Sequence, residues 1–586
     1  MKLRTSALAT MGFLGLACGN HDWGNDASGD AATELPPTFG DAALGEAGKT
    51  GDEKCSDDQR HVVDSKGNPI QTCTQDEQCA LGACVPACEA AKLNNSTIGC
   101  DYYAVDPGSM FGEAGSCFAA YVANTWTTDI GVEVTYDGKT LDLAGLARIP
   151  SGSGANITYA PLPNGKIPAG SMAILFLADW KTSTGFQVTH CPAGITPGFT
   201  AAEASSQYTG IYKAFHVTTS APVVAYDIFP YGGKESYISS ATLLVPTSAW
   251  DTNYVAVDGY APPPAPQAGE PFIQIVAWQP NTQVTISPTA AIVGGLDVPA
   301  TGKGVPRTYD LSPGDVLQLK QHDELNGSPI LSNVPVGVWG GHSCMDIETG
   351  NGDCDSAHQQ LFPVKAMGSE YAAVKHKNRI GFNEKPPYRI VGAVDGTTLT
   401  YDPPIAGAPT TLSQGQLVKF STTSDFVVKS QDAAHPFYIG AHMMGVYSQG
   451  QSFGVGDPDW VNVIPGEQWL PKYVFFTDPT MSETNLVVVR KKASDGTFKD
   501  VKLDCMSGNV TGFAPIGSSG AYESARVDLV TAGAKVGACD NGLHEMHSEE
   551  PFGLTVWGYD FAVSYAYPAG ARVKPLNTVV VPPTPK

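Results

Sequence analysis

The sequence predicts an all-β protein built from repeated modules, and three observations support this prediction. Gly (64 residues) and Pro (44 residues) are abundant and only 16% of the residues are charged, a composition typical of short strands joined by turns. Helical patterns of ten residues or more are nearly absent. A chain of 586 residues exceeds what one hydrophobic core sustains, so we expect roughly three to five modules.

Two repeated sequence elements mark the modules. In the first, an apolar residue and Pro are followed by three residues, Trp or Met, three further residues and a Tyr that begins a strand pattern. This element occupies residues 245–254, 362–371 and 464–473. The second is a Pro that opens a strand, and it occurs at Pro222, Pro335, Pro436 and Pro551. Two independent elements with one period of about 100–115 residues indicate internal repetition.

The strand content of one repeat favours a β-sandwich. Asp137-Gly138 and Asp395-Gly396 are turn pairs between strand patterns, which is hairpin chemistry. Roughly six or seven short strands fit into one repeat, as in a sandwich module. A β-propeller is the alternative, although this repeat is long for a four-stranded blade. We therefore predict tandem β-sandwich-like repeats over residues 101–575, followed by a tail at 576–586.

The N-terminus resembles a bacterial lipoprotein signal. Lys2 and Arg4 precede an apolar run that ends at Ala17 and is too short to span a bilayer as a mature helix. A small residue directly before Cys18 resembles a lipoprotein cleavage box, although Gly15 stands where such boxes usually carry Leu. We expect residues 1–18 to be an export signal with lipidation at Cys18. Ordinary secretion is the alternative.

Residues 19–54 predict a flexible acidic tether. The segment is rich in Gly, Ala, Asp and Glu and poor in large apolar residues, so it cannot bury enough surface to fold alone. No second apolar stretch of about 20 residues occurs in the sequence, and we predict no transmembrane helix. The expected location is the cell envelope, as an outer membrane lipoprotein, or the extracellular space. By analogy with bacterial lipoproteins, Gly19 after the Cys favours the outer membrane.

The cysteines indicate an oxidising compartment. Of the 13 Cys, setting Cys18 aside leaves an even number, which suits disulfides. The disulfide candidates are Cys55, Cys73, Cys79, Cys84, Cys88, Cys100, Cys117, Cys191, Cys344, Cys354, Cys505 and Cys539. Residues 55–100 hold almost no core, so we predict a small Cys-rich unit stabilised by disulfides. Its spacings contain no CxxC pair, which argues against a zinc site.

Some pairings are expected from position along the chain. Cys344 and Cys354 bracket a short Gly/Asp-rich loop, and Cys505 and Cys539 bracket a segment near the end. We expect each to form a local bridge. We also expect Cys100 to pair with Cys117, which leaves Cys191 to pair with the small N-terminal unit. Pairing within that unit cannot be read from the sequence.

Charge and motifs restrict the function. With 35 basic and 58 acidic residues the net charge is -23, so nucleic acid and anionic membrane surfaces are poor partners. No Walker loop or HExxH pattern occurs, and we predict no catalytic residues and no cofactor. His342 stands two residues before Cys344, but a disulfide at Cys344 is the preferred interpretation over a Cys–His nucleophile.

Three patterns were weighed as ligand sites. His544-Glu545-Met546-His547 has HExH spacing, which does not place both His on one helical face, and we interpret it as a polar surface loop. The acidic loop 346–355 is the one candidate for Ca²⁺, although it departs from the EF-hand template. It carries Asp346, Glu348, Asn351, Asp353 and Asp355. The repeated aromatics are interpreted as packing residues and not as a sugar-binding strip: Trp250, Tyr254, Trp469 and Tyr473.

The sequence resembles the N-terminal domain of IgGFc-binding proteins. The segments that carry the resemblance are Cys100–Val105, Phe118–Thr125, Gly340–Cys344, Gln359–Pro363, Pro551–Asp560 and Ser564–Gly570. The match covers about 100–575, and its motifs keep their order and spacing. Members of this family with a lipoprotein-like signal are bacterial. The resemblance implies a non-catalytic extracellular binding domain, and it does not establish that this chain binds antibody.

We therefore expect a cell-surface protein that binds or adheres to an extracellular protein or glycan, attached to the membrane only through its lipid. An envelope structural protein that assembles with itself is one alternative, since exposed edge strands allow such assembly. An extracellular glycan hydrolase is another, and it requires two carboxylates facing each other across a cleft.

Overall fold

The computed structural model describes residues 53–583 apart from 57–58, 108–113, 186–187, 201–206, 263–268, 348–353, 380, 382 and 446–453. The chain divides into two compact units, Met1–Gly51 and Asp52–Lys586, and the description below concerns the second. The predicted signal 1–18 lies outside the described residues, as does the predicted tether except for its last two positions.

The predicted all-β class is confirmed. Strands dominate the described residues, and the α-helices among them are α1 (Ala87–Asn94) and the single turn α2 (Leu143–Leu146). No described helix is long and apolar enough to cross a membrane.

The small Cys-rich unit precedes the repeats. Its strands are β1 (Lys54–Cys55), β2 (His61–Val63), β3 (Pro69–Thr72), β4 (Glu77–Ala80) and β5 (Ala83–Pro86). Disulfides Cys55–Cys79 and Cys73–Cys84 lie within it, and Cys88–Cys100 joins α1 to the first strand of the first module. The apolar cluster around Val62 consists largely of cysteines, so the bridges replace a core.

The expected Cys100–Cys117 bridge is wrong. Cys100 pairs with Cys88, and Cys117 pairs with Cys191, 74 residues away in sequence. Cys191 therefore does not reach the N-terminal unit. The reason is tertiary: the loop that carries Cys191 lies beside the start of β7, where the Cys117 amide donates a hydrogen bond to the Thr189 carbonyl oxygen at 2.8 Å. The structure also joins Cys344 to Cys354 and Cys505 to Cys539.

Four modules follow in chain order. The first contains β6 (Ile98–Ala104), β7 (Phe118–Ala123), β8 (Ile130–Tyr136), β9 (Lys139–Thr140), β10 (Ala147–Ser151), β11 (Thr158–Pro161), β12 (Lys166–Ile167), β13 (Met172–Ala178), β15 (Phe215–Phe229) and β16 (Ser240–Leu243). The second contains β17 (Asp251–Val255), β18 (Pro271–Ala277), β19 (Thr282–Ile286), β20 (Arg307–Leu311), β21 (Asp315–Lys320), β22 (Pro329–Met345) and β23 (Asp355–Gln360), and β14 (Gly210–Lys213) pairs with its β21.

The third and fourth modules complete the repeat. The third contains β24 (Glu370–Ala373), β25 (Pro387–Gly392), β26 (Thr397–Thr398), β27 (Thr400–Asp402), β28 (Thr411–Leu412), β29 (Leu417–Ser421), β30 (Phe426–Lys429), β31 (Phe437–Met443) and β32 (Asp459–Asn462). The fourth contains β33 (Leu470–Phe476), β34 (Glu483–Lys491), β35 (Val501–Leu503), β36 (Ala514–Ile516), β37 (Tyr522–Thr531), β38 (Ala534–Lys535), β39 (Leu543–Asp560) and β40 (Val563–Pro568).

One long, bent strand organises each module. In β39 the first half pairs with β33 and the second half with β34, and the register shifts between His547 and Phe552. In β15 the pairing with β6 shifts between Thr218 and Val223 in the same way. The shift lies beside the repeated Pro in both strands, where a residue without an N–H group costs no ladder hydrogen bond. In the third module the equivalent strand is interrupted, so that β30 and β31 are separate strands.

A buried tyrosine spans the bend in every module. The hydroxyl groups of Tyr102, Tyr254 and Tyr371 donate hydrogen bonds to the carbonyl oxygens of the residues that follow Pro222, Pro335 and Pro436, at 2.7, 2.9 and 2.6 Å. In the fourth module Tyr473 makes this bond to the carbonyl oxygen of Phe552. The predicted packing role of the repeated aromatics is thereby confirmed for the Tyr position.

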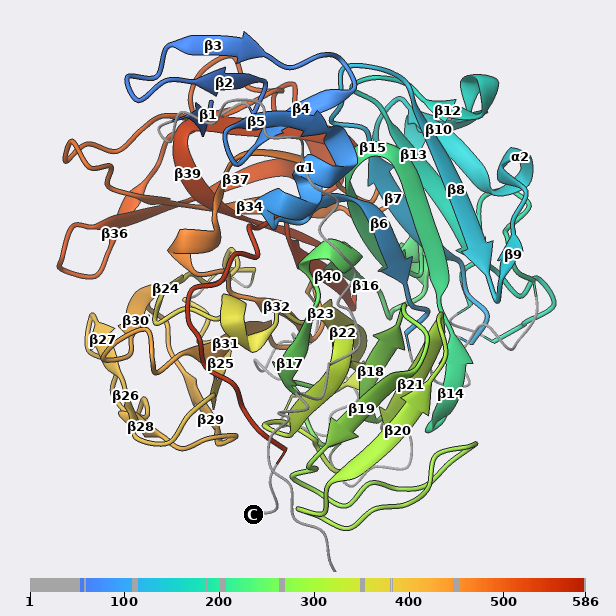
Figure 1. The fold of residues 1–586 in the computed structure, drawn as a ribbon, viewed down its shortest axis with the longest axis vertical. Helices are drawn as coiled ribbons and strands as arrows, with labels where there is room; N and C mark the ends of the chain where they lie inside the picture. The colour runs from blue at the N-terminus through green and yellow to red at the C-terminus, as the bar shows by residue number, and fades with distance from the viewer. Residues whose placement is uncertain are drawn as a thin grey trace, which may run out of the picture. The chain divides into compact units, whose positions relative to one another are not determined.

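The four modules surround a common centre, where the last strand of each module lies innermost (Figure 1). These inner strands are β16, β23, β32 and β40, and neighbouring modules contact each other through them. The His358 amide in β23 donates to Ser240 Oγ in β16 at 2.9 Å, and Asn462 Nδ2 in β32 donates to the Gln360 carbonyl oxygen in β23 at 2.9 Å. In the first, second and fourth modules the strands form one continuous, curled sheet, and the circular arrangement of the four modules is that of a propeller.

The two ends of the repeat region meet. The Thr97 amide donates to the Ala571 carbonyl oxygen at 2.8 Å, and the Ala571 amide donates to Thr97 Oγ1 at 3.0 Å. The segment after residue 575, predicted as a tail, packs on the second and third modules: the Leu576 amide donates to the Lys365 carbonyl oxygen at 2.7 Å, and the Val581 amide donates to Asn253 Oδ1 at 2.8 Å.

Candidate binding face

Loops from all four modules gather at one end of the inner strands. We call this end the loop face and define it by the described residues 230–239, 256–262, 374–379, 477–482 and 560–562. The first and fourth modules meet there, since the Gly232 amide donates to Asp478 Oδ2 at 2.8 Å and Lys234 forms an ion pair with Asp560 at 3.2 Å. A surface built from loops on a rigid β scaffold is where binding residues usually lie.

The second and third modules also meet at the loop face. The rings of Tyr260 and His442 lie edge to face at 5.4 Å, and the Arg389 guanidinium lies over the Tyr260 ring at 4.3 Å. Burial lowers the pKa of His442 well below its ordinary value, and the positive charge of Arg389 lowers it further. This histidine is therefore held neutral and belongs to the packing beneath the loops.

Two exposed aromatic residues stand together on the loop face. Tyr237 is 37% exposed and Phe561 is 41% exposed, and their rings lie edge to face at 6.3 Å. Tyr237 has a φ of 59°, a left-handed conformation that is costly for a bulky residue. The fold thus holds a tyrosine in a strained conformation and leaves it partly exposed. Neither residue belongs to a repeated element, and exposure of this kind is invisible to sequence patterns.

A Ser–His–Asp arrangement lies at the centre of the modules. His358 Nε2 is 2.6 Å from Asp227 Oδ1, and His358 Nδ1 is 3.0 Å from Ser240 Oγ. All three residues are fully buried, and burial raises the pKa of Asp227 against the opposing effect of His358. A catalytic triad requires access for a substrate, whereas these groups join the first and second modules by hydrogen bonds. We interpret them as structural.

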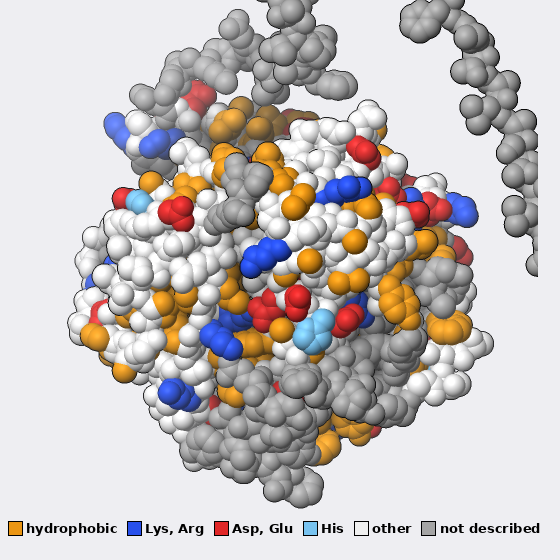
Figure 2. Space-filling model, turned by 90° about the horizontal axis from the view of Figure 1, so that it is seen from below, with side chains coloured by type: hydrophobic (Ala, Val, Ile, Leu, Met, Phe, Trp, Pro, Cys, Tyr) orange, Lys and Arg blue, Asp and Glu red, His pale blue; other side chains and the backbone are white. Residues whose placement is uncertain are grey.

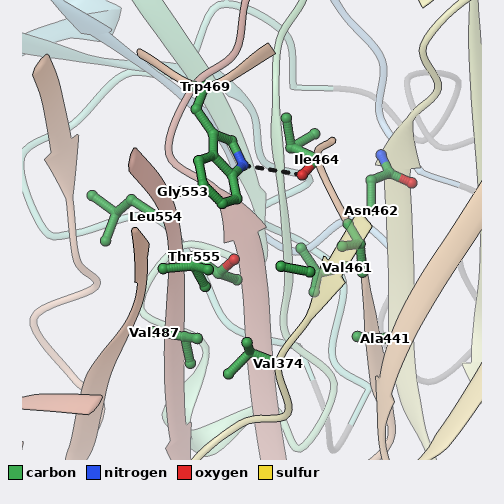
Figure 3. A pocket seen from close by; sticks show the side chains of 14 residues that line it. Val374, Ala441, Val461, Asn462, Ile464, Trp469, Val487, Gly553, Leu554 and Thr555 are labelled. Carbon is green, nitrogen blue, oxygen red and sulfur yellow. Dashed lines mark hydrogen bonds between the residues drawn. The ribbon is translucent and has the colours of Figure 1, made fainter. Parts of the chain in front are cut away.

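The repeated tryptophans lie inside the protein. Trp250 and Trp469 are each 3% exposed, and each indole nitrogen donates to a carbonyl oxygen five residues earlier, at 2.9 and 3.0 Å. Trp469 borders a small gap of about 30 Å³ between the third and fourth modules (Figure 3). A gap of this size holds roughly one or two water molecules and no sugar. These tryptophans are therefore packing residues and do not form a sugar-binding strip, which agrees with the interpretation of the sequence.

The candidate metal patterns are only partly described. Of the acidic loop, Glu348, Asn351 and Asp353 lie outside the described residues, and the Ca²⁺ expectation stays a prediction. The interpretation of residues 544–547 as a surface loop is wrong, because they lie in β39 and alternate between buried and more exposed positions. His544 hydrogen-bonds Asp504 at 3.0 Å, and Cys505 beside them is committed to its disulfide and cannot ligate a metal.

Charged side chains are sparse on the surface. Figure 2 shows one side of the molecule, where the described surface is mostly backbone and uncharged polar side chains, and hydrophobic and charged side chains are scattered between them. This distribution agrees with the 16% charged residues of the chain. Such a face offers no extended single-sign field for nucleic acid.

The fold and the loop face define a class of protein: a multi-module β scaffold that presents loops for binding. Comparison with protein families places the chain more narrowly. A family model described as IgGFc binding protein matches residues 240–558, more than half of the chain, and the chain belongs to this family. The matched range begins at β16 and ends in β39, so the first module lies almost entirely outside it. No curated protein matches the chain.

Family membership supports a binding protein with an extracellular protein partner, and it fits a secreted or surface location. The family description names no ligand for this chain.

Proposed function

We propose that this chain is a non-catalytic surface protein that holds an extracellular ligand on its loop face. The observation that carries the proposal is the exposed pair Tyr237 and Phe561, placed by the first and fourth modules at the point where the loops of all modules gather. Aromatic side chains lose little conformational entropy on binding and contribute large contact areas, which is why they dominate binding energies.

Attachment to the outer membrane through a lipidated Cys18 forms part of this proposal. Its support is the sequence of residues 1–18, followed by an acidic segment that is poor in large apolar residues. A tether of this kind places the binding domain away from the membrane surface. Intact mass of the protein isolated from its native envelope tests this part: a chain that begins at a lipid-modified Cys18 supports it, and one that retains Met1 contradicts it.

The binding test uses purified protein spanning residues 53–586, probed against immobilised Fc fragment, mucin and a glycan array. The test variant is Tyr237→Ala with Phe561→Ala, and the matched control is Leu296→Ala, because Leu296 is 65% exposed but lies between β19 and β20, outside the loop face. We expect the double variant to lose about tenfold or more in affinity for any bound probe, and the control to retain it. Equal binding by both would contradict the proposed face.

A further inference from the structure

At the edge of the loop face that residues 374–379 form, the third and fourth modules line an open pocket of about 410 Å³. Seven polar or charged residues line it: Lys375, Lys377, Asn378, Asn383, Thr423, Asp425 and Arg526. The lining thus carries three cations and one carboxylate. A protein with a net charge of -23 has few places where positive charge is in excess, and this pocket is one of them.

Lys375 is the source of that excess. It is 6% exposed, and its ammonium group donates to Asn378 Oδ1 at 2.8 Å, to Asn383 Oδ1 and to the Glu384 carbonyl oxygen at 2.9 Å. All three acceptors are uncharged. A buried charge is costly unless an opposite charge pairs with it. Asp425 and Glu384 act on this ammonium electrostatically, but Asp425 is ion-paired with Arg526 and Glu384 with Arg379.

The other two cations keep donors available. Arg526 Nη2 is committed to Asp425, at 2.8 and 3.0 Å, and to the Lys375 carbonyl oxygen, whereas Nη1 and Nε make no hydrogen bond within the described residues. Lys377 Nζ donates twice to Asp528, at 2.8 Å each, which leaves its third hydrogen for a ligand. With Asp425 and Asp528 each neutralising one cation, the charge of Lys375 remains.

The uncharged groups add hydroxyl-binding capacity. Because the Oδ1 atoms of Asn378 and Asn383 accept from Lys375, the amide orientation is set, and both Nδ2 groups keep their hydrogens available within the described part of the chain. The exposed Thr423 hydroxyl is a further donor and acceptor. The pocket exceeds the volume of a bare inorganic anion and lies in the range of small-molecule sites.

We propose that this pocket binds the carboxylate of an acidic sugar residue. Arg526 and Lys377 donate hydrogen bonds to the carboxylate, and the buried ammonium of Lys375 compensates its charge. Asn378, Asn383 and Thr423 form hydrogen bonds with the hydroxyl groups of the sugar ring. Arginine suits this task because its planar donors match the geometry of a carboxylate. The inference rests on the proposed binding function and names the ligand class for a pocket that shares Lys375, Lys377 and Asn378 with the loop face.

The test measures binding of sodium glucuronate, glucose and sodium sulfate to the 53–586 protein by saturation-transfer difference NMR and calorimetry. We expect glucuronate to bind with a dissociation constant of about 1 mM, and glucose to bind about tenfold more weakly. Arg526→Gln should weaken glucuronate by about tenfold. Arg490→Gln is the matched control, because Arg490 pairs with Glu523 at 2.9 Å on the neighbouring strand, outside the pocket, and it should leave binding unchanged.

Thr423→Val serves if Arg526→Gln fails to fold, since Thr423 is exposed and makes no hydrogen bond in the described residues; it should weaken glucuronate and leave sulfate unaffected. Equal affinity for glucuronate and glucose, or glucuronate binding that neither pocket variant changes, would overturn the proposal. Sulfate binding as tightly as glucuronate would reduce the pocket to a bare anion site and overturn the sugar assignment. These outcomes are separate from those of the Tyr237/Phe561 test, because neither Tyr237 nor Phe561 lines the pocket.

Discussion

The hydroxyl of Tyr254 donates a hydrogen bond to the carbonyl oxygen of Val336, 2.9 Å away, and also accepts one from the Asp251 amide at 3.1 Å. Tyr254 begins the module and Val336 follows the Pro at the bend of its long strand. The contact therefore ties the first strand to the bend, and the equivalent tyrosine repeats it in each of the other modules.

Tyr254→Phe should destabilise the protein by about 1 to 3 kcal/mol, because the variant leaves a buried carbonyl and a partly buried amide without their partner. Tyr208→Phe is the control, since Tyr208 is 58% exposed. Urea unfolding of both variants against the parent measures the difference. A loss no greater than that of the control would show that the tyrosine does not hold the bend.

Gly340 allows the second module to pack. A Cβ at this position would lie 1.6 Å from the Val257 carbonyl oxygen, so backbone must shift to admit a side chain. We expect Gly340→Ala to cost about 3 kcal/mol or more. The control is Gly131→Ala, where the nearest atom would be Ser220 Oγ at 3.7 Å. Thermal unfolding that ranks the two variants equally would contradict this account.

The Cys117–Cys191 bridge closes a loop of 74 residues, whereas Cys73–Cys84 closes one of 11. In the chain-entropy model, replacing both cysteines with Ser should cost about 4 kcal/mol for the long loop and about 3 kcal/mol for the short one. Urea unfolding of each double variant tests the order. The reverse order would show that native-state packing, and not loop length, governs the stabilisation.

His342 should make stability depend on pH. Burial lowers its pKa to about 3, and the positive charges of Lys320 and Arg389 contribute in the same direction. The unfolded chain takes up a proton near the ordinary pKa of about 6.5, so stability is lost as pH falls below that value toward 3. His342→Gln should flatten the decline by about 1.4 kcal/mol per pH unit between pH 6 and 4. Urea unfolding at several pH values gives the slopes, and identical slopes would refute the assignment.

The repeat could be recognised in the sequence where its packing depends on a residue type with a special role, such as Pro or Tyr. Pro222, Pro335 and Pro551 each mark the bend of a long strand, and Pro436 directly precedes β31, because a residue without an N–H group fits a break in the ladder. The Tyr element was not recognised in the first module, because Tyr102 forms the same hydrogen bond without a Pro-x3-Trp sequence before it. A shared tertiary role does not require a shared local motif.

The candidate sites were beyond sequence patterns. Tyr237 and Phe561 come from different modules, and the pocket around Lys375 joins residues of the third module to Arg526 of the fourth. Pairing of Cys117 with Cys191 was missed for the same reason. Proximity along the chain favoured Cys100, whereas the fold brings a distant loop beside β7.

The sequence by itself determined the all-β class, the period of the repeat and the cysteine-stabilised N-terminal unit. These follow from local chemistry: turn residues, strand alternation, and a Pro or Tyr recurring at fixed spacing. The repeated Pro was predicted to open a strand, whereas Pro222, Pro335 and Pro551 lie inside long bent strands. Only the tertiary structure decided that the modules surround a centre, that the Thr97 and Ala571 segments join the two ends, and which side chains remain exposed. Such features depend on contacts between residues hundreds of positions apart, where no local pattern constrains the partner.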